Sequence, residues 1–290
     1  MKLIFGCGYL GLRVAKLWLS EANTVSAVTR SQQRADLLAN SGISPIVADI
    51  MHPETLTELP EAETVLFAVG FDRTSGKTIG QVYAEGLANV LAALPAATVR
   101  VIYISSTGVY GQNEGEEVDE ESPCQPTREG GQAALAAERV LRSSRFASQS
   151  SILRLAGIYG PDRVPHAKAL LTGHSISSPA DGFLNLIHVD DAARAVIAAE
   201  CSAAAGRTYC VSDGHPTVRR AYYAEMARLL NTRPPVYDES GTGHTPRSRG
   251  GGSKRVRNRR LLEELDVSPK YPSYREGLAE ILGSAQNLDQ

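Results

Sequence analysis

The sequence predicts an α/β fold of the doubly wound type, in which helices cover both faces of a parallel sheet, with a smaller C-terminal part. Three observations predict it. A glycine-rich turn joins an apolar run to a helical pattern at the N-terminus, strands and helices then alternate, and two apolar runs (TVLFAV at 64–69, VRVIYI at 99–104) are typical of strands buried on both faces. A chain of 290 residues is long enough for such a fold.

The first turn has the GxGxxG spacing of a dinucleotide-binding Rossmann fold. Gly6, Gly8 and Gly11 lie between the apolar run 2–5 and the helical pattern 12–21. Gly6 would let the chain turn, Gly8 would let the backbone approach a pyrophosphate, and Gly11 would let helix and strand pack closely. The helix N-terminus would attract the phosphates. The alternative is a purely structural turn between strand and helix.

The remaining elements follow in order, with helical periodicity between apolar runs. The predicted strands are 24–28, 43–48, 64–69, 99–104 and 151–155. The predicted helices are 34–40, 78–94, 132–142, 190–200 and 219–231. Loops lengthen beyond Gly157, so we expect a Rossmann domain at 1–155 and a smaller part at 156–290, from which about 183–203 returns to the first domain.

Composition excludes several classes of protein. A formal net charge of −2 gives no global attraction to nucleic acid, and no apolar stretch approaches the length of a membrane span. The N-terminus lacks a signal region. Four scattered cysteines without metal-ligand spacing (Cys7, Cys124, Cys201 and Cys210) indicate reduced thiols and no metal site. We therefore expect a soluble cytoplasmic protein.

The end of the second strand favours NADP over NAD. An NAD site usually has an acid there for the ribose 2′-hydroxyl, whereas this chain has Thr29, Arg30 and Ser31. Arg30 could pair with a 2′-phosphate, with the two hydroxyls as further donors. NAD remains an alternative if Arg30 is only a solvated loop residue.

Several motifs resemble the extended short-chain dehydrogenase/reductase superfamily, of the NAD-dependent epimerase/dehydratase type. They occur in the expected order over nearly the whole chain: GxGYLG at 6–11, Asp49-Ile50, Ala68-Val69-Gly70, SSTGVYG at 105–111, LRLAGIYGP at 153–161 and NLIHVDD at 185–191. LRLAGIYGP and the later KRVRNRRLLEEL are most similar to the bacterial YeeZ-type members.

The resemblance implies roles for individual residues. Thr107 matches the catalytic Ser/Thr, which donates a hydrogen bond to the substrate oxygen, while Tyr110 is expected to be packed. The implied cofactor-binding residues are Gly6, Gly8, Tyr9, Leu10, Gly11, Thr29, Arg30, Ser31, Asp49, Ile50, Ala68, Val69, Gly70 and Ser105. The implied substrate-binding residues are Tyr159, Arg163, Asn185, Lys254 and Arg255. Members often dimerise through two long helices, here about 78–94 and 128–145.

The chain departs from this family at its central acid/base. The family's Tyr and the Lys four residues later fall on about Gly130 and Ala134, and no Tyr-x-x-x-Lys occurs anywhere. In the family, the Lys cation favours the Tyr phenolate, and loss of a general acid/base costs about 10²–10⁴-fold in rate. Glu129 could act as a base, but an exposed carboxylate at a helix start is the simpler interpretation. His188 is expected to be a structural hinge.

A basic run covers Arg247, Arg249, Lys254, Arg255, Arg257, Arg259 and Arg260. It could be a lid that holds a phosphate-bearing substrate, or a solvated loop entering an amphipathic helix with Leu261, Leu262 and Leu265. A nucleic-acid patch would need interleaved aromatic residues, which are absent.

Two hypotheses follow. The first is an NAD(P)-dependent oxidoreductase or epimerase/dehydratase, acting on a nucleotide-sugar or other phosphate-bearing substrate by a non-standard proton route. The second is a non-catalytic NADP(H)-binding sensor or regulatory module.

Overall fold

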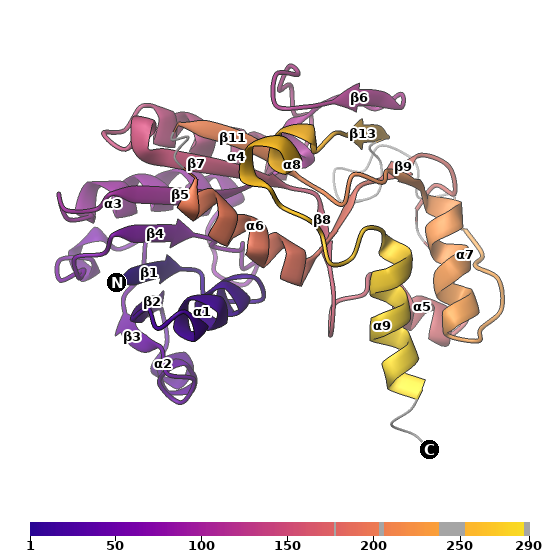
Figure 1. Ribbon diagram of the computed structural model, residues 1–290, viewed down its shortest axis with the longest axis horizontal. Helices are drawn as coiled ribbons and strands as arrows, with labels where there is room; N and C mark the ends of the chain where they lie inside the picture. Colours follow the sequence, from indigo (N-terminus) through magenta and orange to yellow (C-terminus); the bar gives the residue numbers. More distant parts are fainter. Residues whose placement is uncertain (177, 203–205, 238–252, 287–290) are drawn as a thin grey trace.

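Seven parallel strands form the sheet in the order β11-β7-β5-β4-β1-β2-β3, which confirms the doubly wound fold (Figure 1). The computed structural model describes residues 1–176, 178–202, 206–237 and 253–286, with side chains as far as 283. The strands are β1 (Lys2–Phe5), β2 (Val25–Thr29), β3 (Ser44–Val47), β4 (Thr64–Phe67), β5 (Arg100–Ser106), β7 (Ser150–Leu155) and β11 (Arg207–Val211). Parallel strands end at one edge, so the glycine turn after β1 and the Ser/Thr motif after β5 share it.

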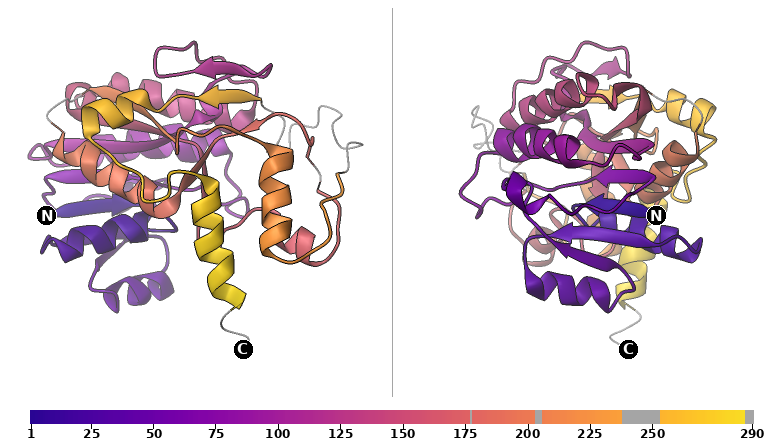
Figure 2. Two further views of the ribbon diagram at one scale, coloured as in Figure 1. Left: turned by 45° about the vertical axis from the view of Figure 1, so that its right-hand side comes forward. Right: turned by 90° about the vertical axis from the view of Figure 1, so that its left-hand side faces the viewer.

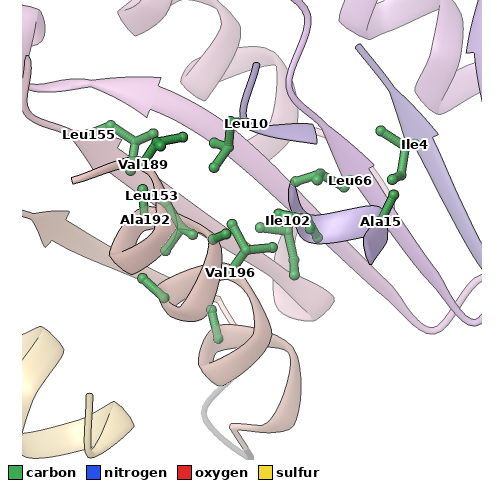
Figure 3. Close-up of a cluster of buried hydrophobic side chains, with 14 of the residues drawn as sticks. Ile4, Leu10, Ala15, Leu66, Ile102, Leu153, Leu155, Val189, Ala192 and Val196 are labelled. Carbon is green, nitrogen blue, oxygen red and sulfur yellow. The ribbon is translucent and has the colours of Figure 1, made fainter. Parts of the chain in front are cut away.

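Helices cover both faces of this sheet. On one face lie α1 (Gly11–Ser20) and α6 (Val189–Cys201), whose apolar side chains pack on strand residues such as Ile4, Ile102 and Leu153 (Figure 3). On the other face lie α3 (Gly86–Ala93) and α4 (Glu129–Arg142), packed on Leu3, Phe67 and Tyr103 among others. Burial on both faces explains the near-continuous apolar sequence of the central strands.

Three predicted helices differ in detail. The helix expected at 132–142 is α4, which begins three residues earlier, at Glu129. The helix expected at 34–40 is α2 (Gln32–Ala39), which begins earlier because the Ser31 hydroxyl accepts a hydrogen bond from the Arg34 amide and caps it. The helix expected at 78–94 starts at residue 79 and contains a π-helical turn (Gln81–Glu85) before α3. The change occurs at Gly86, where an added Cβ would lie 2.6 Å from Ile50 Cδ1.

The C-terminal part was the least predictable from the sequence. Strand β11 was not expected, yet it adds the edge strand to the sheet by pairing with β7. The segment expected to return, 183–203, contains α6, which packs against α1 and the sheet. The division at residue 155 stays a prediction, because β11 also belongs to the sheet.

The C-terminal elements that lie beyond the sheet in Figure 2 form a second, tyrosine-rich core. It includes Tyr159, Tyr222, Tyr223 and Tyr274. Its elements are β8 (Gly157–Tyr159), α5 (Ala167–Leu171), β9 (Phe183–Leu184), β10 (Leu186–His188), β12 (Thr217–Val218), α7 (Arg219–Leu229) and α9 (Tyr274–Gln286).

Beside it, β6 (Glu116–Val118) pairs in parallel with β13 (Lys254–Val256), which leads to α8 (Arg259–Leu265). Leu261 and Leu265 of α8 are buried and Leu262 is exposed, as an amphipathic helix requires. All four cysteines are free, as predicted. Among the described helices, none has the length and apolar character needed to cross a bilayer.

Candidate functional site

The glycine turn has the geometry that a pyrophosphate requires. Gly6 has a φ of +90°, and a Cβ there would overlap the Ala68 carbonyl, so the turn after β1 touches the turn after β4. A Cβ at Gly11 would overlap the Gly6 carbonyl, so α1 packs directly on the turn. A Cβ at Gly8 would meet nothing within 4 Å. Packing therefore requires glycine at two of these positions, whereas at Gly8 the backbone faces open space.

The start of α1 is also suited to an anion. No side chain caps this helix, and no acidic residue lies in its first turn, so the positive end of the helix dipole is left to a ligand. Gly70, which follows β4, likewise has nothing within 4 Å of an added Cβ. The residues present therefore fit a dinucleotide, whose nicotinamide supplies hydride chemistry when bound.

Tyr9 joins this turn to the C-terminal part. Its hydroxyl donates to the Pro161 carbonyl at 2.9 Å, and two guanidinium groups contact its ring, with Arg13 4.3 Å and Arg163 5.3 Å from its centroid. Arg13 in turn pairs with Asp190 at 2.9 Å. The predicted cofactor residue Tyr9 and the predicted substrate residue Arg163 are thus neighbours.

Arg30 is exposed after β2 and already has an anionic partner. Its Nη2 lies 2.9 Å from Asp72 Oδ2, and the hydrogen bonds from Thr74 and Arg30 lower the pKa of Asp72 to about 2. The Ser31 side chain caps α2, so it is not free to act as the predicted phosphate donor without releasing Arg34 N. Sequence reasoning missed both Asp72 and Arg34, whose Nη2 donates to the Cys7 carbonyl inside the glycine turn at 2.8 Å.

Asp49 and Ile50 lie in the loop directly after β3. Asp49 Oδ1 accepts from the Met51 amide at 2.9 Å, and Ile50 is buried against Gly86. Ile50 therefore supports the packing of α3, while Asp49 is half-buried. No described contact tests their predicted role in cofactor binding.

Thr107 begins the 3₁₀ turn η3 (Thr107–Val109), directly after β5. The side chain of Ser106 caps this turn through the Gly108 amide at 3.0 Å. The N-terminus of α4 packs on it closely, because a Cβ at Gly131 would overlap the Gly108 carbonyl. The turn that carries Thr107 therefore contacts the helix start where the family has its catalytic Tyr.

Beneath Thr107 lies a buried polar network. Glu138 of α4 is completely buried and accepts from Ser105 Oγ (2.7 Å), Arg154 Nε (2.9 Å) and Arg154 Nη2 (2.8 Å). Arg154 Nη1 also donates to the Tyr110 hydroxyl, which lies 3.0 Å from Cys210 Sγ. Tyr110 is packed, as predicted. Ser105 is buried and its hydroxyl donates to Glu138, so it forms part of this network, while its predicted role in cofactor binding stays a prediction.

The side chains of two predicted substrate residues already bind other parts of the protein. Both groups of the Asn185 amide bind the backbone of β13, with Nδ2 donating to the Lys254 carbonyl and Oδ1 accepting from the Val256 amide. Tyr159 is fully buried, with its hydroxyl donating to the Ser273 carbonyl and its ring packed edge-on to His188. Direct substrate contact by either residue would require these contacts to break.

The described part of the basic run is mostly paired. Arg257 binds Glu117, Arg260 binds Glu121, and Arg255 Nε donates to the Gly115 carbonyl. Arg247 and Arg249 lie outside the described residues. Lys254 is half-buried, and its Nζ donates to the Tyr110 carbonyl at 3.1 Å.

The positions of the missing pair contain no acid or base. An added Cβ at Gly130 would be in ordinary contact with Ile79, and Ala134 is buried in an apolar cluster with Val109 and Leu135. Glu129 is exposed at the first position of α4. His188 is buried, its ring centroid lies 3.8 Å from that of Tyr271 in a tilted contact, and burial lowers its pKa.

Comparison with known proteins places this geometry in a family. The model of the NAD dependent epimerase/dehydratase family matches residues 3–211. Protein YeeZ of Escherichia coli K12 is 28% identical over 276 residues, which cover 93% of this chain and 95% of that protein.

Solved structures agree in fold. One from Methylobacillus flagellatus is 30% identical with a TM-score of 0.80, covering 98% of both chains. The UDP-glucose 4-epimerase of Thermotoga maritima, solved with UDP-glucose, superposes over 100% of both chains with a TM-score of 0.81 at 18% identity, which shows the fold alone. With its open glycine turn and the matched residues 3–211, this chain belongs to the NAD-dependent epimerase/dehydratase family.

Proposed function

We propose that this protein is an NADP(H)-dependent oxidoreductase or epimerase/dehydratase that acts on a nucleotide-sugar or other phosphate-bearing substrate. The observation that carries the proposal is the open backbone at Gly8 beside the uncapped start of α1. Steric contacts account for Gly6 and Gly11, but no contact within the protein accounts for Gly8. A pyrophosphate at that position does.

In this proposal Arg30 selects the cofactor. Its guanidinium would exchange Asp72 for the 2′-phosphate of NADP, which is a stronger acceptor. NAD lacks this phosphate, and Asp72 would then keep Arg30. The competition between the two acceptors makes the preference measurable.

Thr107 would orient the substrate by donating a hydrogen bond to the oxygen of the reacting carbon. It is 9% exposed and starts a turn that is capped by Ser106 and supported by α4, so its position is well defined. Lys254 supplies positive charge beside the same turn and suits a substrate phosphate. Arg163, next to Tyr9, is a second cation on the cofactor side.

The second candidate is a non-catalytic NADP(H) sensor or regulatory module. It is favoured by one observation: the two positions of the acid/base pair hold Gly130 and Ala134, and Ala134 is packed among apolar side chains. Such a protein would bind the cofactor and change its interaction with a partner.

Calorimetric titration with NADPH and NADH, followed by a panel of nucleotide-sugars and carbonyl compounds, separates the two candidates. Turnover that falls about 10²-fold or more in Thr107→Ala but is largely kept in Thr107→Ser supports the enzyme, since only the hydroxyl differs between the variants. Tight cofactor binding with no turnover of any compound supports the sensor. Binding of neither cofactor contradicts both.

Homodimerisation and a cytoplasmic location belong to the same proposal. A groove of about 590 Å³ is lined by charged residues of the β6–β13 region and α8, whereas a smaller one of about 440 Å³ lies between α3 and α4 and includes Ala88, Leu91 and Val140. The second groove is on the two helices expected to form the dimer. Sedimentation of the wild type and of Ala92→Glu, an exposed position of the same groove, would test this: the variant should be monomeric if this face pairs.

A further inference from the structure

Lys254 is held firmly at the first position of β13. The strand pairs in parallel with β6, with Lys254 opposite Glu116. Asn185 binds it from the other side, at 2.8 Å to the Lys254 carbonyl and 2.7 Å from the Val256 amide. Because both groups of one amide are used, the backbone from which the lysine side chain extends is fixed along its length.

The amine of Lys254 reaches the turn that carries Thr107. Its Nζ donates at 3.1 Å to the carbonyl of Tyr110, the residue that follows η3. The start of α4 contacts the same turn through Gly108 and Gly131. One short turn therefore brings together Thr107, the Lys254 amine and the helix start at which Gly130 stands where the family has Tyr.

The surroundings make this amine able to exchange a proton near neutral pH. Burial and the guanidinium of Arg128, just before α4, lower the pKa of Lys254 to about 8, against the opposing effect of Glu116 on β6. At pH 7 roughly a tenth of such groups are neutral, whereas an ordinary lysine with a pKa of about 10.4 is almost wholly charged. A group with a pKa close to the working pH is best placed for general acid–base catalysis.

We propose that Lys254 is the proton-transfer residue of this site, and that it replaces from β13 the acid/base pair that α4 lacks at Gly130 and Ala134. The inference rests on the proposed enzyme function. It gives Lys254 a role in chemistry in addition to the substrate binding expected from its basic run.

The proton balance closes at Nζ. In the oxidative direction the neutral amine takes the proton of the substrate hydroxyl and becomes an ammonium, while the hydrogen on carbon leaves with its electron pair to an oxidised nicotinamide cofactor. In the reductive direction the ammonium returns the proton to the carbonyl oxygen. Thr107 holds that oxygen by its hydroxyl, and the Tyr110 carbonyl orients the ammonium.

Substitution by arginine separates proton transfer from charge. Lys254→Arg keeps the positive charge and can hold a phosphate, but a guanidinium does not lose its proton in this pH range. We expect Lys254→Arg to lower kcat about 10²–10⁴-fold and to change KM for the substrate only a few-fold. Lys254→Met should lower kcat and also raise KM, because it removes both the proton and the charge. Lys16→Met, which removes an exposed lysine of α1, is the matched control.

A second measurement needs no substrate. Competitive acylation of the wild-type protein by an amine reagent, followed by mass spectrometry, gives the titration of each lysine. Lys254 should become reactive with a midpoint near pH 8 once its lower accessibility is normalised, well below the midpoint of about 10.4 of lysine in model peptides.

The outcomes distinguish this inference from the proposed function. If Lys254→Arg keeps wild-type turnover and its pH profile, or if Lys254 titrates near the ordinary lysine value of about 10.4, the inference is wrong while the enzyme function stands. If the wild type binds NADPH but turns over no compound, the proposed function fails and the inference fails with it. Loss of kcat in Lys254→Arg with unchanged cofactor affinity supports both.

Discussion

Replacing Arg154 by Met should strongly destabilise the protein, because it leaves a buried carboxylate without its cation. Glu138 is completely buried and receives two of its hydrogen bonds from Arg154. Arg142, on the exposed side, approaches Glu138 at 3.3 Å and compensates only in part. The variant also leaves the Tyr110 hydroxyl without its donor.

The magnitude follows from the burial of the pair. Removing one partner of a buried ion pair costs about 3–5 kcal/mol, which is a large part of a typical stability of about 5–15 kcal/mol. Replacing both partners, as in Arg154→Met with Glu138→Met, removes the uncompensated charge. The remaining cost comes from Ser105 and Tyr110, at about 1–3 kcal/mol for each unsatisfied group. The double variant should therefore be less destabilised than the sum of the single variants.

Urea unfolding monitored by circular dichroism measures these differences. Four proteins are compared: the wild type, the two single variants and the double variant, with Arg142→Met as a control for an exposed partner. We expect strong non-additivity and a change below about 1 kcal/mol for the control. A cost below about 1 kcal/mol for Arg154→Met, or strict additivity, would refute the assignment of this network as the support beneath Thr107.

Cofactor choice should depend on the ion pair between Arg30 and Asp72. Arg30→Ala should weaken the binding of NADPH about 10- to 100-fold and leave the binding of NADH nearly unchanged. Asp72→Asn should strengthen the binding of NADPH, because it removes the competing anionic acceptor. Equal loss of both cofactors in a calorimetric titration of Arg30→Ala would show that Arg30 does not recognise the 2′-phosphate. Stability should also depend on Asp213, whose buried Oδ2 lacks a hydrogen-bond partner and whose pKa is raised to about 7 by burial. The folded state holds this proton more tightly than the unfolded chain does. Protonated Asp213 therefore adds up to about 4 kcal/mol to the free energy of unfolding below a pH of about 3.9, and this stabilisation is lost as the pH rises to about 7. Asp213→Asn should remove this dependence in urea titrations, and parallel pH curves for the two proteins would contradict the burial argument.

Much of the fold could be predicted from local patterns. The strands at β1, β4, β5 and β7 are apolar on both faces, and that property is visible in a single stretch of sequence. Strand β11 is different, because it begins with Arg207 and Thr208 and lies at the sheet edge, where only Tyr209, Cys210 and Val211 need to be buried. Its pattern therefore resembles a loop.

The site shows the same limit. Gly6, Gly8 and Gly11 could be predicted because their roles are local to one turn. The position of Lys254 could not, because it depends on contacts with Tyr110 and Asn185, which lie far away in the sequence. From the sequence alone, a lysine in a basic run cannot be distinguished from a solvated one, because the distant segments that contact it are not known.

In the proposed function, the open backbone at Gly8 binds a dinucleotide. Gly8→Ala adds a Cβ that meets no atom of the protein within 4 Å, so the free energy of unfolding should change by less than about 1 kcal/mol. Gly283→Ala, at an equally open glycine of α9, is the control.

Calorimetric titration of the wild type and both variants with NADPH and NADH tests this claim directly. We expect the wild type and Gly283→Ala to bind NADPH with the same affinity, and Gly8→Ala to bind it at least tenfold more weakly, about 1.4 kcal/mol, because the methyl group occupies the space of the pyrophosphate. Equal affinity in Gly8→Ala, or no binding of either cofactor by the wild type, would contradict it.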